Sequence, residues 1–276
     1  MARNRVRIAR VPSLLALSLS TALLLTATAC GSGDKDAAGG PDSGAGGKNG
    51  DGPVVVATTT WEGAFAKAAG AEDVTVIVPS SARHAPDYDP RPSDLAAVAA
   101  ADFVLYAPFE PYAEKIRQAA GSSAKLVEVA LDNDAGKASA EVTRLGALFG
   151  TEDAAARWNT SFKSTYGTLQ KDLKAAWPGG RAPAVVAQVF SVWSARMTGA
   201  NVTGTYGPEA VTAGQLADLA KKKPSYVFDN VHMTTGEVLP DAGAEQVGIV
   251  NYPGEDLDLL AVYKNAADTI EKAMTA

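Results

Sequence analysis

The chain has 276 residues and a net charge of −6, because 31 Asp and Glu outnumber 25 Lys and Arg; it contains two His and one Cys. The acidic excess argues against a nucleic-acid partner, because proteins that bind nucleic acids neutralise phosphates with basic patches. The single cysteine excludes an internal disulfide, so the folded part must be stabilised by burial alone.

Residues 1–29 are predicted to be a signal peptide. Four arginines precede the apolar run LLALSLSTALLL, which is too short for a comfortable membrane span, and small residues lead from it to Cys30. This ending is similar to a bacterial lipobox, although Ala27 stands where Leu is commoner. We expect Cys30 to carry lipid, including palmitate, and to anchor the protein to the extracytoplasmic face of the cell membrane. The alternative is a secreted protein with a free cysteine.

Residues 30–52 are predicted to be the lipidated cysteine and a flexible tether. The segment after Cys30 is nearly all Gly, Ala, Asp, Ser and Lys, so it has too little to bury to offset the entropy of ordering. The leader's only charges are its four arginines, which leaves 21 basic against 31 acidic residues in the mature chain, a net charge of −10. This charge is compatible with a cationic cargo, although exported domains are also acidic for solubility.

From residue 53 onward, apolar strand-like runs alternate with helical stretches. Strands are expected at residues 54–60, 74–79, 103–107, 125–130, 184–190, 225–229 and 246–250. Helices are expected at residues 61–70, 94–101, 110–121, 152–177, 212–223 and 256–274. Ser93, Thr151 and Thr212 are the expected N-caps of three of these helices. Alternation of this kind predicts parallel sheets with helices on their faces.

The helix expected at residues 152–177 is longer than the others. Its apolar residues recur at spacings of three and four along one stripe, from Trp158 through Phe162 to Trp177. We predict an α/β fold of two lobes with parallel-type sheets, joined by this backbone helix and separated by a cleft. The expected bounds are 53–150 for the N-terminal lobe, 151–178 for the linking helix and 179–276 for the C-terminal lobe. No internal repeat is evident.

Enzyme function is not expected. The sequence contains neither a G-x-S-x-G elbow nor an H-E-x-x-H motif, and two histidines leave little for acid–base chemistry. The loop aromatics Trp61, Trp193, Tyr206 and Tyr252 could line a pocket for an organic ligand, but packing at the lobe interface is the preferred interpretation.

Several segments together resemble one family, the zinc- and manganese-binding solute receptors of bacterial ABC importers. VVVATTTWEGAFAKAAG is similar to that family's first strand and helix, and RHAPDYDPRPSD to its first ligand loop, which would make His84 a ligand. FEPYAEKI places Glu110 at a recurring acidic position, and the long helix is similar to the family's backbone helix. The resemblance implies capture of a divalent metal, zinc or manganese, and its delivery to a membrane permease by a monomeric receptor.

The chain departs from the family in its remaining ligands. Where a second first-lobe histidine is usual it offers Asp132 and Asp134, and where a third ligand is usual it offers Gln188. The region of the family's closing aspartate contains Asn251, Glu255 and Asp256, and the family's mobile His-rich loop is absent from the sequence.

The metal-ligand set that we predict combines the two histidines with carboxylates: His84, His232, Glu110, Asp229 and Asp256. Imidazole and carboxylate ligands suit zinc or manganese. His232 follows a predicted strand at its carboxyl end, where α/β folds bind ligands, and Asp229 lies three residues before it. The alternative is the same fold with a drifted site that binds a non-metal ligand or a partner protein.

Overall fold

The computed structural model describes residues 52–79, 87–122, 124–234 and 236–276. The predicted signal peptide, Cys30, most of the predicted tether, and His84 therefore lie outside the described residues. Contacts divide the chain into residues 1–47 and residues 48–276, and everything described below belongs to the second unit. Within these described ranges, no helix is long and apolar enough to cross a membrane.

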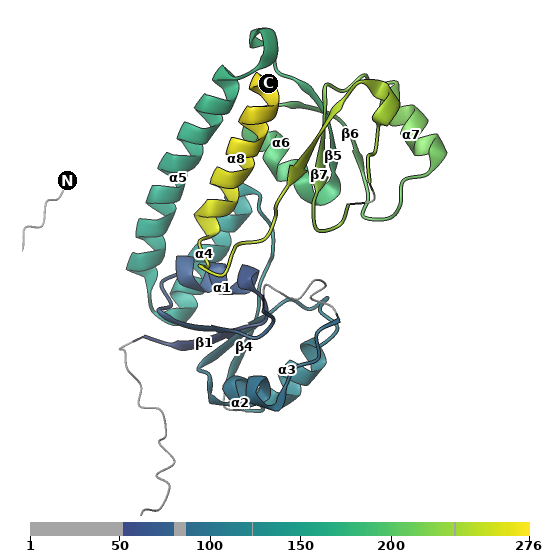
Figure 1. The fold of residues 1–276 in the computed structure, drawn as a ribbon. Helices are drawn as coiled ribbons and strands as arrows, with labels where there is room; N and C mark the ends of the chain where they lie inside the picture. The colour runs from purple at the N-terminus through teal and green to yellow at the C-terminus, as the bar shows by residue number, and fades with distance from the viewer. Residues whose placement is uncertain (1–51, 80–86, 123, 235) are drawn as a thin grey trace, which may run out of the picture. The chain divides into compact units, whose positions relative to one another are not determined.

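The first sheet contains four parallel strands in the order β2-β1-β3-β4 (Figure 1). They are β1 (Val54–Ala57), β2 (Asp73–Val76), β3 (Phe103–Tyr106) and β4 (Lys125–Glu128). Helices α1 (Thr60–Ala68), α2 (Pro92–Ala100) and α3 (Ala113–Ala120) connect or follow them. Each strand ends before the predicted bound. The threonines after β1 lead into α1, and apolar residues such as Ile77, Ala107 and Val129 follow the other three strands without belonging to the ladder.

The start of α1 is fixed by a capping box. Thr59 has extended backbone angles, and its hydroxyl accepts from the backbone N–H of Trp61 at 3.2 Å. Glu62 returns the interaction, because its carboxylate accepts from the backbone N–H of Thr59 at 3.1 Å. The prediction of Ser93 as the N-cap of α2 is wrong: Arg91 holds that position, because Pro92 takes the first helical turn, where it needs no N–H partner.

The second sheet repeats this topology, with four parallel strands in the order β6-β5-β7-β8. The strands are β5 (Ala184–Gln188), β6 (Asn201–Tyr206), β7 (Tyr226–Asn230) and β8 (Glu245–Ile249). Helices α6 (Val192–Thr198) and α7 (Ala213–Ala220) flank them, together with short 3-10 turns at Pro178–Gly180, Val189–Ser191 and Pro240–Ala242. Thr212 caps α7 as predicted. Strand β6 and helix α6 were not predicted, since NVTGTY contains a glycine and lacks an apolar run.

Three long helices complete the fold: α4 (Ala135–Phe149), α5 (Glu152–Ala175) and α8 (Leu259–Thr275). Helix α4 was not predicted. It packs closely on α5, because a Cβ added at Gly146 would lie only 2.5 Å from the Cβ of Ala155. Thr151 precedes α5 as expected, but its side chain donates to the carbonyl of Ala69 at 2.6 Å rather than capping the helix.

The apolar stripe of α5 packs against α8 through aromatic rings. The ring centroids of Phe162 and Tyr263 are 4.8 Å apart, and Trp158 stacks on Phe162 at the same distance. Trp193, from the second sheet's side, contacts Tyr263 at 5.2 Å. One core cluster therefore includes residues of both sheets and of the long helices. The predicted fold class, two parallel α/β lobes with a long joining helix, is confirmed.

Candidate metal site

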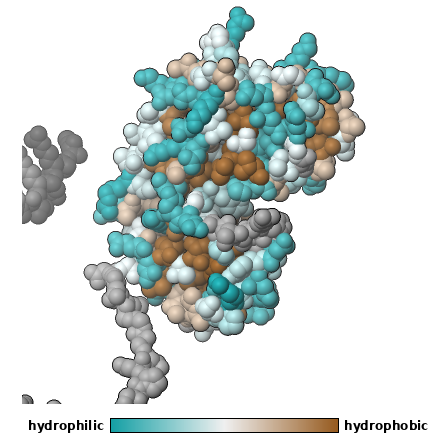
Figure 2. Space-filling view, viewed as in Figure 1, coloured by the Kyte–Doolittle hydropathy of each residue, from teal (hydrophilic) through white to brown (hydrophobic). Residues whose placement is uncertain are grey.

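The carboxyl ends of the strands carry the molecule's most exposed hydrophobic side chains. Among the described residues, the large exposed ones all follow strands β3, β5, β7 or β8: Phe109, Val189, Phe190, Val231, Met233 and Val250. Figure 2 shows brown hydrophobic patches on an otherwise mostly hydrophilic face. Ligands of open α/β sheets bind at the carboxyl ends of strands, so the candidate site is expected among the residues that follow these strands.

The first turn of α1 and the loop after β3 bring two carboxyl groups into the interior. Glu62 is 0% exposed and Glu110 is 8% exposed. Burial raises the pKa of Glu62 to about 8, with a further rise from the negative charge of Glu110. Burial also raises the pKa of Glu110. Glu110 accepts from the backbone N–H of Ala107 at 3.1 Å and from the hydroxyl of Tyr112 at 3.0 Å.

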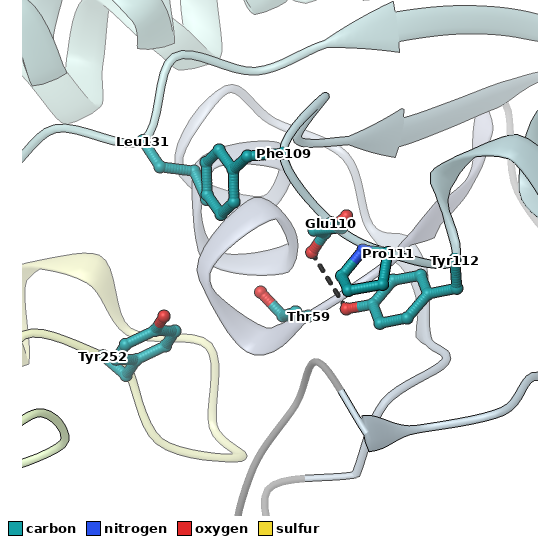
Figure 3. Close-up of a pocket in the computed structure, with 7 residues that line it drawn as sticks. All are labelled: Thr59, Phe109, Glu110, Pro111, Tyr112, Leu131 and Tyr252. Carbon is teal, nitrogen blue, oxygen red and sulfur yellow. Dashed lines mark hydrogen bonds between the residues drawn. The ribbon is translucent and has the colours of Figure 1, made fainter.

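A cavity of about 50 Å³ opens beside this pair. Its lining consists of Thr59, Phe109, Glu110, Pro111, Tyr112, Leu131 and Tyr252. Figure 3 shows Phe109 beside Leu131, with Tyr252 approaching from another element and the Glu110–Tyr112 hydrogen bond at the opposite side. On this measure one water needs roughly 10–15 Å³, so the cavity has room for an ion with a few waters. Drug-sized organic ligands need roughly 300 Å³ or more.

His232 reaches this region through Tyr252. The two ring centroids are 4.9 Å apart in an edge-to-face contact, and Tyr252 makes a second such contact with Trp61, also at 4.9 Å. Burial lowers the pKa of His232, which keeps the imidazole neutral and able to ligate a metal near neutral pH. Trp61 and Tyr252 pack together, and Tyr252 also lines the cavity. The expectation that Trp61, Trp193 and Tyr206 lie in loops is wrong, because they belong to α1, α6 and β6.

The other two predicted ligands of the described residues have different surroundings. Asp229 is 2% exposed, and its carboxylate accepts from the hydroxyl of Tyr206 at 2.6 Å and from the side-chain amide of Gln246 at 3.3 Å. Asp256 is exposed and accepts from the backbone N–H of Asp258 at 3.3 Å. Over the described ranges, no group of three or more His, Cys, Asp or Glu is arranged to hold a metal. With His84 outside those ranges, the five-residue ligand set stays a prediction.

Side-chain amides lie at the carboxyl ends of strands of the second sheet. Asn251, just after β8, accepts from the indole N–H of Trp193 at 2.9 Å and donates to the carbonyl of Phe190 at 3.0 Å. Asn133 donates to the carbonyl of Asn251 at 2.9 Å, and the hydroxyl of Tyr263 donates to the carbonyl of Asn133 at 3.1 Å. These bonds join the loop after β4 to the second sheet and to α8.

The remaining candidates from the sequence are also engaged in structural contacts. Asp132 forms a salt bridge with Lys137 at 2.6 Å, and Asp134 caps α4 while pairing with Arg196 at 2.9 Å. Gln188 accepts from the backbone N–H of Phe190 at 2.6 Å. Sequence reasoning also missed one residue, Glu62. The T-x-x-E pattern that begins at Thr59 predicts a cap, and such a pattern cannot indicate that the carboxylate is buried beside a second one.

Comparisons with known proteins bear on this fold and site. A family model described as "Zinc-uptake complex component A periplasmic" matches residues 55–145, which include most of the first sheet and α4. The resemblance predicted from the sequence is confirmed for this segment. No curated protein sequence matches the chain.

Solved structures extend the likeness to nearly the whole described unit. A zinc-bound ZnuA deletion mutant has a TM-score of 0.60 at 18% identity, covering 82% of this chain and 99% of that one. FpvC from Pseudomonas aeruginosa in complex with Mn²⁺ has a TM-score of 0.59 at 14% identity, with 80% and 97% covered. The laminin-binding protein Lmb of Streptococcus agalactiae, described as an adhesin with metal-transporting activity, has a TM-score of 0.57 at 16% identity, with 81% and 98% covered. At these identities the likeness establishes the shared two-lobe fold.

Proposed function

We propose that the protein is an extracytoplasmic solute-binding receptor that captures a divalent metal ion and delivers it to an ABC-type importer. The observation that carries this proposal is a likeness to metal-bound solute-binding proteins over 80% or more of this chain and nearly all of theirs. The family match over residues 55–145 supports the same function from the sequence side. The ion-sized cavity at the carboxyl ends of the strands agrees with a metal as cargo rather than a large organic ligand.

The proposed ligands are the two histidines and a subset of the carboxylates. Glu110 lines the cavity, and His232 packs on Tyr252, another cavity residue. His84 is included on the strength of the motif around it. Asp229 and Asp256 rank below these three, because the first accepts from the hydroxyl of Tyr206 and the second from the backbone N–H of Asp258. Mixed nitrogen and oxygen ligands are compatible with both zinc and manganese.

Metal analysis of the purified full chain tests the proposal. The wild type should retain about one equivalent of zinc or manganese after dialysis, and His84→Ala and His232→Ala should each lower the affinity about 100-fold or more, since each removes a ligand. The matched control is Asn201→Ala on the exposed surface of β6, which should bind like the wild type. A wild type that binds no divalent metal would overturn the proposal.

Lipid anchoring is a separate part of the proposal. The leader and Cys30 support a lipoprotein that works next to its permease, with residues 31–52 as the tether. Cys30→Ser should be released from the membrane fraction or remain unprocessed. A mature Cys30→Ser protein that still fractionates with membranes would contradict the anchor, and it would leave metal capture untouched.

The second candidate function is a receptor of the same fold whose cargo is not a metal. Gln188 and Asn251 favour it, because amides stand where the family resemblance implies stronger metal ligands. This alternative predicts that neither zinc nor manganese changes the melting temperature. Saturable stabilisation by either metal would exclude it.

A further inference from the structure

The buried carboxyl of Glu62 is not explained by its capping role alone. One oxygen, Oε2, accepts from the backbone N–H of Thr59 and contacts the Thr59 hydroxyl. The other oxygen, Oε1, is fully buried and has no hydrogen-bond partner among the described residues. A capping glutamate needs only one oxygen for its cap, and the first turn of a helix is usually wet. An unpaired buried carboxylate oxygen is costly, so it implies a partner that protein atoms do not supply.

A second buried hydroxyl interacts with the other carboxyl. The Thr58 hydroxyl is on a residue that is 0% exposed and interacts with the Glu110 carboxyl. Thr59, whose hydroxyl contacts Glu62, lines the same cavity as Glu110. Thr59 therefore connects Glu62 with the cavity, which Tyr112 and Tyr252 also line.

The charge of this carboxyl pair is unbalanced among the described side chains. Neither Glu62 nor Glu110 forms a salt bridge there, and the nearest groups around them are hydroxyls, phenols and backbone N–H groups. Glu141 in the same sheet's helix layer is the instructive contrast. It is also buried, at 7% exposure, but Arg144 pairs with it at 2.5 Å. Two buried carboxyls without a cation are stabilised either by a shared proton or by a bound metal ion.

We propose that Glu62 and Glu110, with the hydroxyls of Thr58 and Thr59, form an oxygen-only subsite for a hard divalent cation next to the cavity that Thr59 and Glu110 line. The proposal rests on the proposed function and specifies it further, because it assigns a cargo ligand, Glu62, and a cargo preference. Carboxylate and hydroxyl oxygens suit Mn²⁺, Mg²⁺ and Ca²⁺, whereas Zn²⁺ gains more from imidazole. Of the two metals considered as cargo, the subsite therefore favours Mn²⁺.

Titrations of the purified full chain with Mn²⁺ and with Zn²⁺ test this assignment. Mn²⁺ binding can be followed by the loss of the free-ion electron paramagnetic resonance signal, and Zn²⁺ binding by calorimetry. Glu62→Gln and Glu110→Gln should each lower the Mn²⁺ affinity about tenfold or more, and they should lower the Zn²⁺ affinity less. The matched control is Glu141→Gln, which removes a buried carboxylate that already has a cation and should leave Mn²⁺ affinity unchanged.

The outcomes separate this inference from the proposed function. Glu62→Gln that binds Mn²⁺ like the wild type, while His84→Ala weakens binding, overturns the inference and leaves the metal receptor standing. Mn²⁺ binding that depends on Glu62, with no effect of the chain on manganese or zinc uptake by cells, supports the inference and overturns delivery to an importer. Thermal unfolding without metal confirms that each variant is folded, and a Glu62→Gln protein that melts no lower than the wild type excludes misfolding as the cause.

Discussion

The two sheets have the same strand order, yet their carboxyl ends differ in chemistry. The first sheet's end holds two buried carboxyls beside an ion-sized cavity, and the amides of Asn133 and Asn251 form a hydrogen-bonded network at the second sheet's end. The amides are neutral and hydrogen bonded to one another's loops, so this network stabilises the fold even though Asn133 Oδ1 and Gln188 Nε2 have no hydrogen-bond partner among the described residues. The carboxyl pair is ionisable, and burying its negative charge costs stability. The comparison teaches that shared topology fixes where a site can lie, and that the charge of these buried polar groups distinguishes the two ends.

The largest effect should come from breaking the amide network. Asn251→Ala removes two buried hydrogen bonds and leaves the indole N–H of Trp193 and the carbonyl of Phe190 unpaired, which should lower the free energy of unfolding by about 2–4 kcal/mol. Urea denaturation followed by tryptophan fluorescence measures it. Asn201→Ala, on the exposed edge of β6, is the control and should change stability by less than about 0.5 kcal/mol. Equal losses in both variants would contradict a structural role for the network.

Replacing a carboxyl of the buried pair should have the opposite effect and raise the free energy of unfolding at high pH. Burial and Glu110 raise the pKa of Glu62 from 4.5 to about 8, so between these values the folded protein retains a proton that the unfolded chain releases. The free energy of unfolding should therefore fall as pH rises from about 5 to 8, and Glu62→Gln should remove this fall. At about pH 9 the metal-free variant should be more stable than the wild type by roughly 2–4 kcal/mol, and the two should converge near pH 5.

The control for this pH profile is Glu141→Gln. It removes a carboxylate that accepts from Arg144 and from the backbone N–H of Ala130, so it should lower stability at every pH above about 5. Chemical denaturation at a series of pH values measures both variants. A wild type whose stability is flat between about pH 5 and 8 would show that Glu62 titrates normally.

A smaller effect is expected at Asp229, a carboxylate buried at the carboxyl end of strand β7. Tyr206→Phe removes the hydroxyl that donates to Asp229 at 2.6 Å, which leaves Gln246 as its remaining side-chain donor. Loss of a hydrogen bond to a charged group should cost about 1.5–2 kcal/mol. Metal affinity should stay unchanged if Asp229 is structural. A change in metal affinity of about tenfold or more would identify Asp229 as a ligand of the cargo site.

The sequence predicted most of the fold because its strands are buried and its long helix has a regular stripe. VVVA and FVLY are apolar runs typical of buried parallel strands and lie within predicted strands, and YVFDN extends one residue beyond the strand predicted at 225–229. Strand β6 was missed, since NVTGTY is mostly polar and pairs at the sheet edge. Helix α4 was missed because alanine and glycine, which let it pack closely on α5, give a weak hydrophobic period.

The site was harder to predict, because its chemistry depends on burial. His232 was identified from its position after a strand and Glu110 from the family resemblance, and both lie near the cavity or its aromatic neighbours. The burial of Glu62 could not be predicted, because a capping glutamate on the surface has the same local sequence pattern as one in the interior. Asn251 was noted only as a substitute for a ligand. Its network joins Trp193, Asn133 and Phe190, which are distant in sequence, so no local pattern could reveal it.

The smallest effect should come from the exposed ion pair beside the amide network. Arg196 on α6 contacts Asp134, the N-cap of α4, at 2.9 Å, but its side chain is 65% exposed, so water and salt screen the attraction. Arg196→Met keeps the apolar stem and should lower the free energy of unfolding by only about 0.2–1 kcal/mol, and less in about 1 M salt. Urea denaturation at low and high salt measures it, with Lys221→Met, which breaks the exposed pair with Asp218, as the matched control. A loss as large as that of Asn251→Ala would mean that the ion pair, rather than the neutral amides, holds the loop after β4 to the second sheet.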